Sequence, residues 1–311
     1  MLSVVLATHN GADTISRTLA AMSELEAPAG GWKLIVVNNA STDDTEALVL
    51  NWQDRLPLLY VREPRLGKPM AINTGFAHVE GDLVVMTDDD VLPDRTWLVE
   101  WRKSVDRHPE CSVFGAAIVP EFETPPPNWL DPVWETMLFG ATPDRPEGEI
   151  GPVDVCGGNM GIRRSIVDDG WRFDEKYFVG RLGLMGEDAD FIQRLAEHGH
   201  RICFLPTPRV RHIIHRDQVS WSSMQRRFIR HGRYMFASQD VTYDPATGAP
   251  RFTFPRWRVR RLAVSSLALV PVALSFNRRR LFSHLRGMAY DFGALKQARA
   301  MLSALGHAQA P

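Results

Sequence analysis

The chain has 311 residues, of which 44% are hydrophobic and 23% charged, and its formal net charge is −1. This composition excludes a disordered or fibrous protein and allows one large folded domain with an additional segment. The three cysteines, Cys111, Cys156 and Cys203, lack metal-binding spacing, so we expect reduced thiols in a cytoplasmic protein. The first strand is expected to begin at Leu2, which leaves no room for a secretory signal and predicts that the protein is not exported.

Strands and helices alternate over the first hundred residues. Strand-like runs are expected at 3–7, 33–37, 58–61 and 82–86, and helix-like runs at 13–23, 43–52 and 68–79. This alternation predicts an α/β fold with a mostly parallel sheet and helices on both faces. Asp43 precedes Glu46 by three residues, a spacing that predicts a capping box at the second helix.

Three consecutive carboxylates, Asp88, Asp89 and Asp90, follow the fourth predicted strand. Ligands of such sheets bind beyond the carboxyl ends of the strands. Neighbouring carboxylates repel one another unless a cation or hydrogen-bond donors offset their charge, and hard oxygen ligands suit Mg²⁺ or Mn²⁺. The triplet therefore predicts a divalent cation site, with a solvated turn as the alternative.

Beyond residue 101 the alternation weakens. A further strand is expected at 112–118, followed by a proline-rich stretch at 120–152 that contains Trp129. Prolines disfavour regular helix and central strand, so we expect a long surface loop with a short helix near 132–138. Loops of this length are uncommon unless they bind ligands or cover sites.

A second group of acids, Glu187 and Asp188, opens a helix that is expected to end at Gly199. On helical periodicity Asp188 shares the inward face with Phe191 and Leu195. A helix N-terminus favours the ionised carboxylate that a general base requires. The alternative is that both acids only complement the helix dipole.

Two further segments carry candidate site residues. Gly157, Gly158 and Asn159 offer flexible backbone and a small amide, which suit close approach to a ligand. His212 and His215 lie on an extended apolar segment. We weigh His212 equally as a metal ligand and as a structural residue.

Seven motifs in this order resemble the family 2 glycosyltransferases of the GT-A fold over roughly residues 2–235. They are 5–10 (VLATHN), 36–43 (VVNNASTD), 67–73 (GKPMAIN), 88–90 (DDD), 157–163 (GGNMGIR), 186–188 (GED) and 210–212 (VRH). The resemblance implies a GT-A mixed sheet with helices on both faces.

The resemblance also implies roles for residues. The nucleotide base and ribose would meet Thr8, Asn10, Asn38 and Asp43, with Lys68 near the base or phosphates. Asp88 and Asp90 would form a DxD pair that binds the diphosphate through Mg²⁺ or Mn²⁺, with Asp89 adjacent and His212 as a further candidate ligand. Asp188 would be the general base, with Glu187 as its substitute. The acceptor would meet Gly157, Gly158, Asn159 and Trp129.

Asn38 stands where the family commonly has an acid that accepts the imide N–H of uracil. An amide oxygen accepts the same bond without the assistance of charge. A UDP, dTDP or GDP sugar is therefore open as donor, with a slight preference for UDP.

The C-terminal stretch from residue 245 to 290 contains no Asp or Glu. It carries arginines at 251, 256, 258, 260, 261, 278, 279, 280 and 286. The apolar run at 262–276 would reach only ~22 Å as a helix, short of the ~30 Å hydrocarbon core, and Pro271 interrupts it. We expect this helical tail to lie on an anionic membrane surface. A dimer or domain contact is the alternative, and nucleic acid binding is not expected.

The expected organisation is a GT-A domain at 1–240, with a nucleotide-binding half at about 1–110 and an acceptor-binding half at about 111–240, and a tail at 241–311. We predict an inverting glycosyltransferase at the inner face of the cell membrane that uses a lipid-linked or surface-polysaccharide acceptor. One alternative is a sugar-nucleotide nucleotidyltransferase, but the glycine-rich loop that it needs after the first strand is absent. The other is a non-catalytic sugar-nucleotide-binding assembly protein, against which the intact acids argue.

Overall fold

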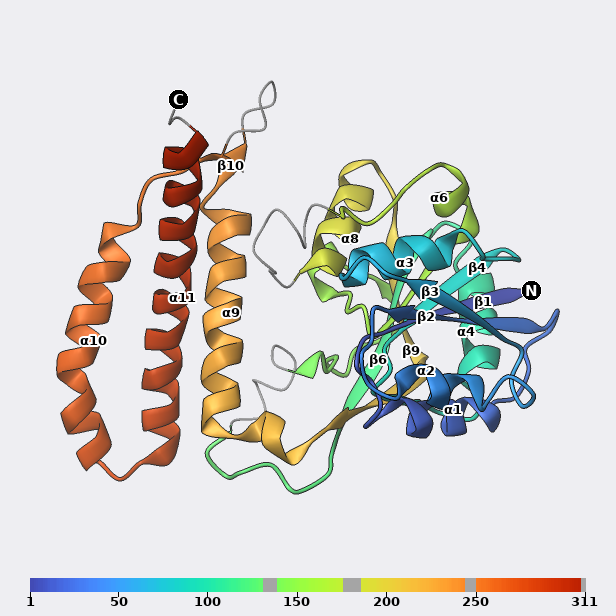
Figure 1. Ribbon diagram of the computed structural model, residues 1–311, viewed down its shortest axis with the longest axis horizontal. Helices are drawn as coiled ribbons and strands as arrows, with labels where there is room; N and C mark the ends of the chain where they lie inside the picture. The colour runs from blue at the N-terminus through green and yellow to red at the C-terminus, as the bar shows by residue number, and fades with distance from the viewer. Residues whose placement is uncertain (131–138, 176–185, 244–249, 309–311) are drawn as a thin grey trace. The chain divides into compact units, whose positions relative to one another are not determined.

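The computed structural model describes residues 1–130, 139–175, 186–243 and 250–308 (Figure 1). The chain forms two compact units, the first from Met1–Glu121 and Glu135–Ile214, the second from Phe122–Trp134 and His215–Pro311. This division falls earlier than the boundary that we expected at residue 240. The short helix expected near 132–138 lies outside the described residues.

The first unit begins with the expected alternation of strands and helices. Its elements are β1 (Leu2–Thr8), α1 (Ile15–Ser23), β2 (Trp32–Asn39), α2 (Thr45–Leu50), β3 (Leu58–Glu63), α3 (Lys68–Phe76) and β4 (Leu83–Thr87). The strands β3, β2, β1 and β4 lie side by side in this order and are all parallel. Their carboxyl ends therefore meet at one edge of the sheet.

Antiparallel strands extend this sheet into a mixed one. The remaining elements of the unit are β5 (Val91–Pro93), α4 (Trp97–Arg107), β6 (Val113–Phe122), β7 (Gly148–Glu149), the 3-10 turn η1 (Pro152–Asp154), β8 (Asn159–Arg163), α6 (Arg164–Asp168), α8 (Glu187–Glu197) and β9 (Ile202–Ile214). The strand order is β3-β2-β1-β4-β8-β6-β9-β5. Because β8 is antiparallel to β4, Asn159 pairs with Thr87, and the glycines before β8 lie beside the acids after β4.

Helices cover both faces of the sheet, as the sequence predicted. Val4 and Leu6 of β1 belong to one buried cluster together with residues of α1 and α4. Val5, which points to the other face, belongs to a second cluster with residues of α3 and α8. Burial on both faces explains why the central strands are apolar without alternation.

The helix termini follow the sequence prediction at α8 but not at α2. Gly186 before α8 and Gly199 after it have φ of +105° and +87°, which favour glycine. Asp43 does not form the expected capping box with Glu46, because its carboxylate instead accepts the backbone N–H groups of Ala12 and Thr45, each at 3.1 Å.

Cys111 and Cys203 form a disulfide across 92 residues of sequence, so the expectation of three reduced thiols is wrong for this pair. Cys111 lies two residues before β6, and Cys203 lies in β9, the neighbouring strand. The pairing follows from strand order in the sheet, which cysteine spacing does not reveal. Cys156 is a free thiol.

The second unit is helical. Its elements are the 3-10 turn η2 (Arg216–Val219), α9 (Trp221–Gln239), β10 (Thr242–Tyr243), β11 (Pro250–Arg251), α10 (Arg256–Leu274) and α11 (Arg278–Ala308). Helix α11 packs on both α9 and α10. Because α9 packs along α11, it groups with the C-terminal helices. Within the described residues, no helix has both the length and the apolarity needed to cross a membrane.

Glycines allow α9 and α11 to approach closely. A Cβ atom added to Gly232 of α9 would lie 2.1 Å from the carbonyl oxygen of Tyr290, and one added to Gly293 of α11 would lie 2.1 Å from that of Ile229. Neither carbonyl can move without shifting its helix. The two glycines are therefore required by the packing distance.

We expect Gly232→Ala to lower the free energy of unfolding by roughly 1–3 kcal/mol, because the helices must separate to admit the methyl group. Urea denaturation followed by far-ultraviolet circular dichroism measures the change. Gly287→Ala in α11 is the matched control, since its Cβ would have no neighbour within 4 Å, and it should stabilise by ~0.5–1 kcal/mol. Equal stability of Gly232→Ala and wild type would contradict the close packing.

Candidate active site

The three acids after β4 point to three different partners. Lys68 Nζ lies 2.6 Å from Asp88 Oδ1, the Thr8 hydroxyl donates to Asp89, and His212 Nε2 lies 3.1 Å from Asp90 Oδ2. None of the three is fully exposed. A purely solvated turn, the alternative that the sequence left open, does not describe this arrangement.

Asp90 and His212 form a pair whose orientation suits a cation. Val91 of β5 pairs with His212 of β9, and the His212 Nδ1–H donates to the Phe139 carbonyl at 2.6 Å. A neutral His212 therefore presents the lone pair of Nε2 towards Asp90. Asp90 Oδ1 is buried and has no hydrogen-bond partner among the described residues.

The electrostatics of this pair agree with its geometry. Burial would raise the pKa of Asp90, but the hydrogen bond and charge of His212 lower it below its ordinary value. Burial would likewise lower the pKa of His212, and Asp90 raises it instead. A protonated His212 supplies the positive charge that stabilises the buried carboxylate of Asp90. A divalent cation would supply the same charge.

Lys68 joins the two groups of acids. It follows Gly67, whose φ of +146° turns the chain into α3. Burial would lower the pKa of Lys68, but Asp88, Asp188 and Glu187 raise it well above its ordinary value. The ammonium group is therefore a fixed positive charge at the carboxyl edge of the sheet, and such a charge suits an anionic ligand.

Gly157 and Gly158 lie between the two groups of acids. A Cβ atom on Gly157 would come 2.0 Å from Asp188 Oδ2, and one on Gly158 would come 3.3 Å from Asp88 Oδ2. Because Gly157 has no side chain, Asp188 lies directly against the backbone of the loop that precedes β8. In this structure the groups that approach the two glycines are carboxylates of the protein itself, and a contact of the glycines with an acceptor stays a prediction.

Asp188 is buried in a way that changes its proton affinity. Burial raises the pKa of Asp188 to about 7, Glu187 and Asp88 act in the same direction, and Lys68 opposes them. Its Oδ1 has no hydrogen-bond partner among the described residues. The expectation that the helix N-terminus keeps this acid ionised is therefore outweighed by burial. A carboxyl group with a pKa near 7 is well matched to taking up a proton at neutral pH.

Glu187 and Asp89 have supporting contacts. Glu187 Oε2 accepts the N–H of Gly186 at 3.1 Å, which closes the start of α8. Burial raises the pKa of Asp89 to about 7, with Asp90 and Asp88 adding to the rise and the Thr8 hydroxyl opposing it.

Two of the residues expected to bind the nucleotide, Asn10 and Asp43, form hydrogen bonds that connect the loop after β1 with the loop after β2. Asn10, with φ +52°, accepts the Thr42 N–H at 2.8 Å through Oδ1. Asn38 donates to the Tyr60 hydroxyl at 2.9 Å and accepts the Ser41 N–H at 3.1 Å. Thr8, Asn10, Asn38 and Asp43 thus lie at the same sheet edge, and their roles with a nucleotide stay predictions.

Two residues expected to contact the acceptor have partners within the protein. Asn159 is fully buried, accepts the Trp97 indole N–H at 3.0 Å and donates to the carbonyls of Ala117 and Pro208. Its amide holds strands together, which contradicts a direct acceptor contact. Trp129 belongs to the second unit, where it stacks on Trp221 with ring centroids 4.5 Å apart.

Glu63 at the end of β3 is a buried acid that sequence reasoning missed. Hydrogen bonds from Arg65 and Thr74 lower the pKa of Glu63 to about 2, against the opposing effect of burial. These bonds shape the loop that leads to Lys68. The sequence pattern that could have identified Glu63 is an acid at the end of a strand, followed two residues later by an arginine.

The mixed sheet with helices on both faces has the GT-A fold, which solved structures share. TarS 1-349 from S. aureus in complex with UDP has a TM-score of 0.55 at 15% identity, over 99% of this chain and 92% of that one. A mannosyltransferase, PcManGT from Pyrobaculum calidifontis, in complex with GDP-Man and Mn²⁺, has a TM-score of 0.55 at 20% identity, over 100% and 76%.

Residues 3–171 match the sequence model of glycosyl transferase family 2. The chain therefore belongs to this family. The probable glycosyltransferase YdaM from Bacillus subtilis (strain 168) is 25% identical over 213 residues, which are 66% of this chain and 49% of YdaM. The chain thus spans about half the length of this relative.

Proposed function

We propose that this protein is an inverting glycosyltransferase that moves a sugar from a nucleoside-diphosphate sugar to a hydroxyl group of a glycan or lipid-linked acceptor. The observation that carries the proposal is that two buried carboxylate oxygens, Asp90 Oδ1 and Asp188 Oδ1, have no hydrogen-bond partner among the described residues, while the charge of Lys68 lowers the pKa of both acids. The oxygen of Asp90 suits a cation, and the oxygen of Asp188 suits the hydroxyl group of an acceptor.

A divalent cation, Mg²⁺ or Mn²⁺, fits the residues present. Asp90, Asp88 and His212 would hold it, because carboxylate oxygens and a neutral imidazole suit these ions and Asp90 Oδ1 has no other partner among the described residues. When bound, the ion neutralises charge that develops on the leaving diphosphate. The Mn²⁺ named with PcManGT supports this proposal.

The remaining steps belong to side chains of this chain. Lys68 binds the diphosphate through its ammonium group, which then exchanges Asp88 for phosphate oxygens. Asp188 accepts the proton of the acceptor hydroxyl, so that the oxygen attacks the anomeric carbon from the face opposite the leaving group. Attack from that face inverts the configuration. Glu187, one residue earlier, is the substitute base.

The donor's base would meet Asn38. One lone pair of its Oδ1 already accepts the Ser41 N–H at 3.1 Å, and the second can accept an imide N–H. UDP keeps its slight preference, although the names of similar structures include both UDP and GDP-Man.

A donor panel tests this function. Purified protein is incubated with UDP, dTDP and GDP sugars plus Mn²⁺, with glycan and polyprenyl-phosphate acceptors, and nucleoside diphosphate release is measured. We expect release with one nucleotide class, and its loss on chelation. Pyrophosphate formation from a nucleoside triphosphate and a sugar phosphate would support the nucleotidyltransferase alternative. Donor binding without release would support the assembly protein.

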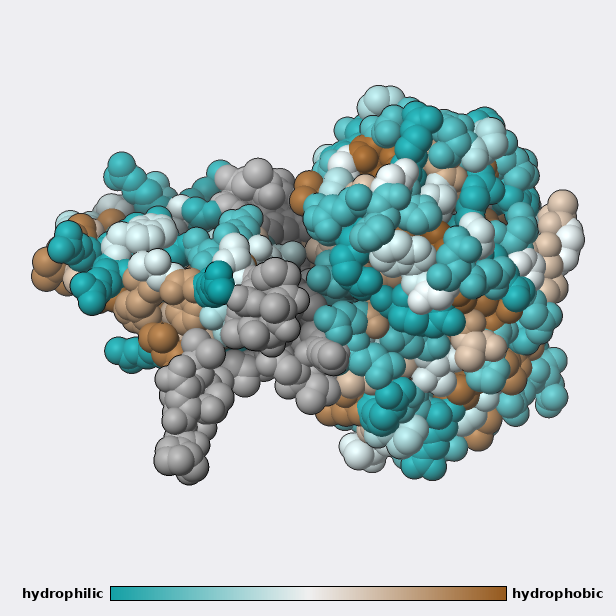
Figure 2. All heavy atoms as spheres, turned by 90° about the horizontal axis from the view of Figure 1, so that it is seen from above, coloured by the Kyte–Doolittle hydropathy of each residue, from teal (hydrophilic) through white to brown (hydrophobic). Residues whose placement is uncertain are grey.

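We infer further that α10 attaches the protein to the cytoplasmic face of an anionic membrane. Apolar side chains stand exposed along α10, with 65% exposure at Val264, 81% at Leu267 and 66% at Leu274. Figure 2 shows both hydrophobic (brown) and hydrophilic (teal) residues on the surface of this unit. Exposed arginines flank them at 256 and 260 and at 278–280. Apolar burial and arginine attraction to anionic headgroups both favour binding.

The arginines do not all share this role. Arg258 and Arg261 form ion pairs with the buried Asp291 of α11. They hold α10 to α11, so fewer charges face a partner than the sequence suggested. Removing the tail would also uncover the face of α9 that packs on α11, which makes point substitutions the better test.

We expect Leu267→Asp to reduce recovery on anionic liposomes at least tenfold, because one buried leucine contributes ~1.5–3 kcal/mol. Flotation measures the recovery, which should also fall at high salt. Val153→Asp is the matched control, since Val153 is 86% exposed on the first unit. Unchanged recovery of Leu267→Asp would favour the dimer contact instead, which sedimentation would reveal.

A further inference from the structure

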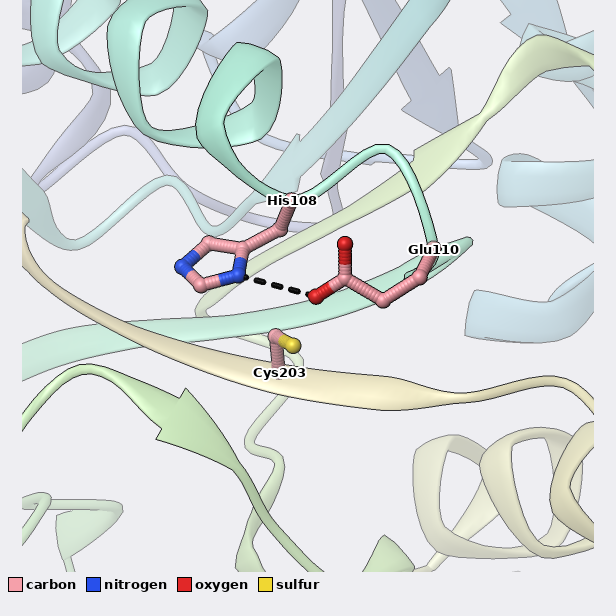
Figure 3. A group of neighbouring side chains, drawn as sticks. All are labelled: His108, Glu110 and Cys203. Atoms are coloured by element: carbon pink, nitrogen blue, oxygen red, sulfur yellow. Dashed lines mark hydrogen bonds and ion pairs between the residues drawn. The ribbon is translucent and has the colours of Figure 1, made fainter.

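A second group of potential metal ligands lies at the other edge of the sheet. It comprises His108 after α4, Glu110 and Cys203 of β9 (Figure 3), together with Cys111, which precedes β6 and forms a disulfide with Cys203. Strand β6 is antiparallel to β8, which is antiparallel to β4, so β6 begins at the edge where β4 begins. This group is therefore separate from the acids that follow β4.

The ligand atoms are already close together. His108 Nδ1 lies 3.1 Å from Glu110 Oε1, which lies 3.9 Å from Cys111 Sγ, and one ligand atom from each of His108, Glu110 and Cys203 lies within 4.8 Å of the others. Ligands around a tetrahedral Zn²⁺ are separated by about 3.3–3.8 Å, given Zn–N near 2.1 Å and Zn–S near 2.3 Å. The observed distances of 3.1 and 3.9 Å are near this range.

A carboxylate orients the ring of His108, as is usual for histidines that bind metals. His108 Nε2 lies 2.8 Å from Glu147 Oε1, and Arg107 clamps Glu147 with bonds of 3.0 and 2.8 Å. A carboxylate on one ring nitrogen directs the lone pair of the other towards the ligand group and increases its basicity. Here that other nitrogen is Nδ1, which faces Glu110.

We propose that reduction of the Cys111–Cys203 disulfide creates a Zn²⁺ site formed by both thiolates, His108 and Glu110. Two thiolates and an imidazole suit Zn²⁺ better than Mg²⁺ or Mn²⁺. Both cysteines are buried, whereas the Glu110 side chain is 40% exposed and gives the ion a route from solvent. The ion would join α4 to β6 and β9.

The disulfide and the metal are alternative states of the same pair. A small disulfide such as oxidised glutathione reacts with the two metal-bound thiolates. The protein disulfide forms, the glutathione disulfide breaks, two protons are taken up, and two glutathione thiols and the metal ion are released. The site therefore responds to the thiol–disulfide balance of its surroundings.

Cobalt substitution of the full chain tests the proposal. Protein reduced with a phosphine is titrated with Co²⁺, whose thiolate ligation gives near-ultraviolet charge-transfer absorption that oxygen ligands do not give. We expect saturation at one ion per reduced chain, displacement by Zn²⁺, and no such absorption for the oxidised protein. Absence of the absorption in the reduced wild type would overturn the proposal.

Variants assign the ligands. Cys203→Ser should remove most of the absorption, and Cys156→Ser, the matched cysteine control, should keep it. Glu147→Gln, a positioning change that leaves the thiols intact, should weaken Co²⁺ binding ~10- to 100-fold. Loss of the absorption in Cys156→Ser, or wild-type affinity in both Glu147→Gln and His108→Gln, would contradict the assignment.

Discussion

Replacing Asp188 by asparagine is expected to lower the rate of sugar transfer by roughly 10²- to 10⁴-fold, the usual cost of losing a general base. The amide keeps the size of the side chain but takes up no proton. Donor affinity should change little, because the proposed donor contacts are made by Asn38, Lys68 and the acids after β4. Single-turnover transfer and donor titration measure the two effects separately.

Asp190→Asn is the matched control for this result. Asp190 lies in the same first turn of α8, where it pairs with Arg194 at 2.9 Å, and its loss should leave transfer nearly unchanged. Near-normal turnover of Asp188→Asn would instead move the role of base to Glu187.

The raised pKa of Asp188 adds a pH signature to the same variant. Because burial raises this pKa to about 7 from the ordinary 3.8, the carboxyl group is protonated below pH 7 and acts as a base only above it. Wild-type transfer should therefore increase with pH through about 7, and the residual activity of Asp188→Asn should lack this step.

The same pKa also lowers stability at neutral pH. Between about pH 4 and 7 the folded protein binds the proton that the unfolded chain has lost, so the free energy of unfolding falls as pH rises. Asp188→Asn avoids this loss. Without metal or donor at pH 8, it should melt at a higher temperature than wild type.

Asp90→Ala is expected to abolish Mn²⁺-dependent donor binding and leave the fold intact. The side chain contributes one pairing, with His212, and one buried oxygen without a partner among the described residues. Its loss removes a ligand from the proposed cation site and little from the packing. Calorimetric donor titration with Mn²⁺ measures the effect.

The same titration in a chelator is the control for Asp90→Ala. Without metal, variant and wild type should bind the donor equally weakly, and their melting temperatures should agree within a few degrees. A variant that bound the donor as tightly as wild type, with unchanged metal dependence, would exclude Asp90 as a ligand.

The alternating first hundred residues were predictable from the sequence. Strands β1 to β4 are short apolar runs bounded by polar turns, and helices α1 to α3 follow them at the expected places. Parallel β-α units depend mostly on local pattern, because each helix covers the strands beside it. The same pattern places polar residues such as Asp88 at the carboxyl edge.

The contacts between distant segments were not predictable. The pattern of residues 156–163 does not reveal that β8 enters antiparallel beside β4. The pattern therefore predicts a ligand contact for Asn159, whereas in the structure its amide connects β8 with β6 and β9. The Cys111–Cys203 pair depends in the same way on β6 and β9 being neighbours.

The sequence by itself determined the α/β class, the family and the identity of the acids at the candidate site, because each follows from periodicity or from motifs in fixed order. Only the tertiary structure decided which partner each acid contacts and in which direction its pKa is shifted. The physical reason is that pKa values depend on burial and on charges a few ångströms away. Asp188 shows this dependence. It lies against Gly157, the charge of Lys68 lowers its pKa, and burial raises that pKa by more than the helix N-terminus and Lys68 lower it.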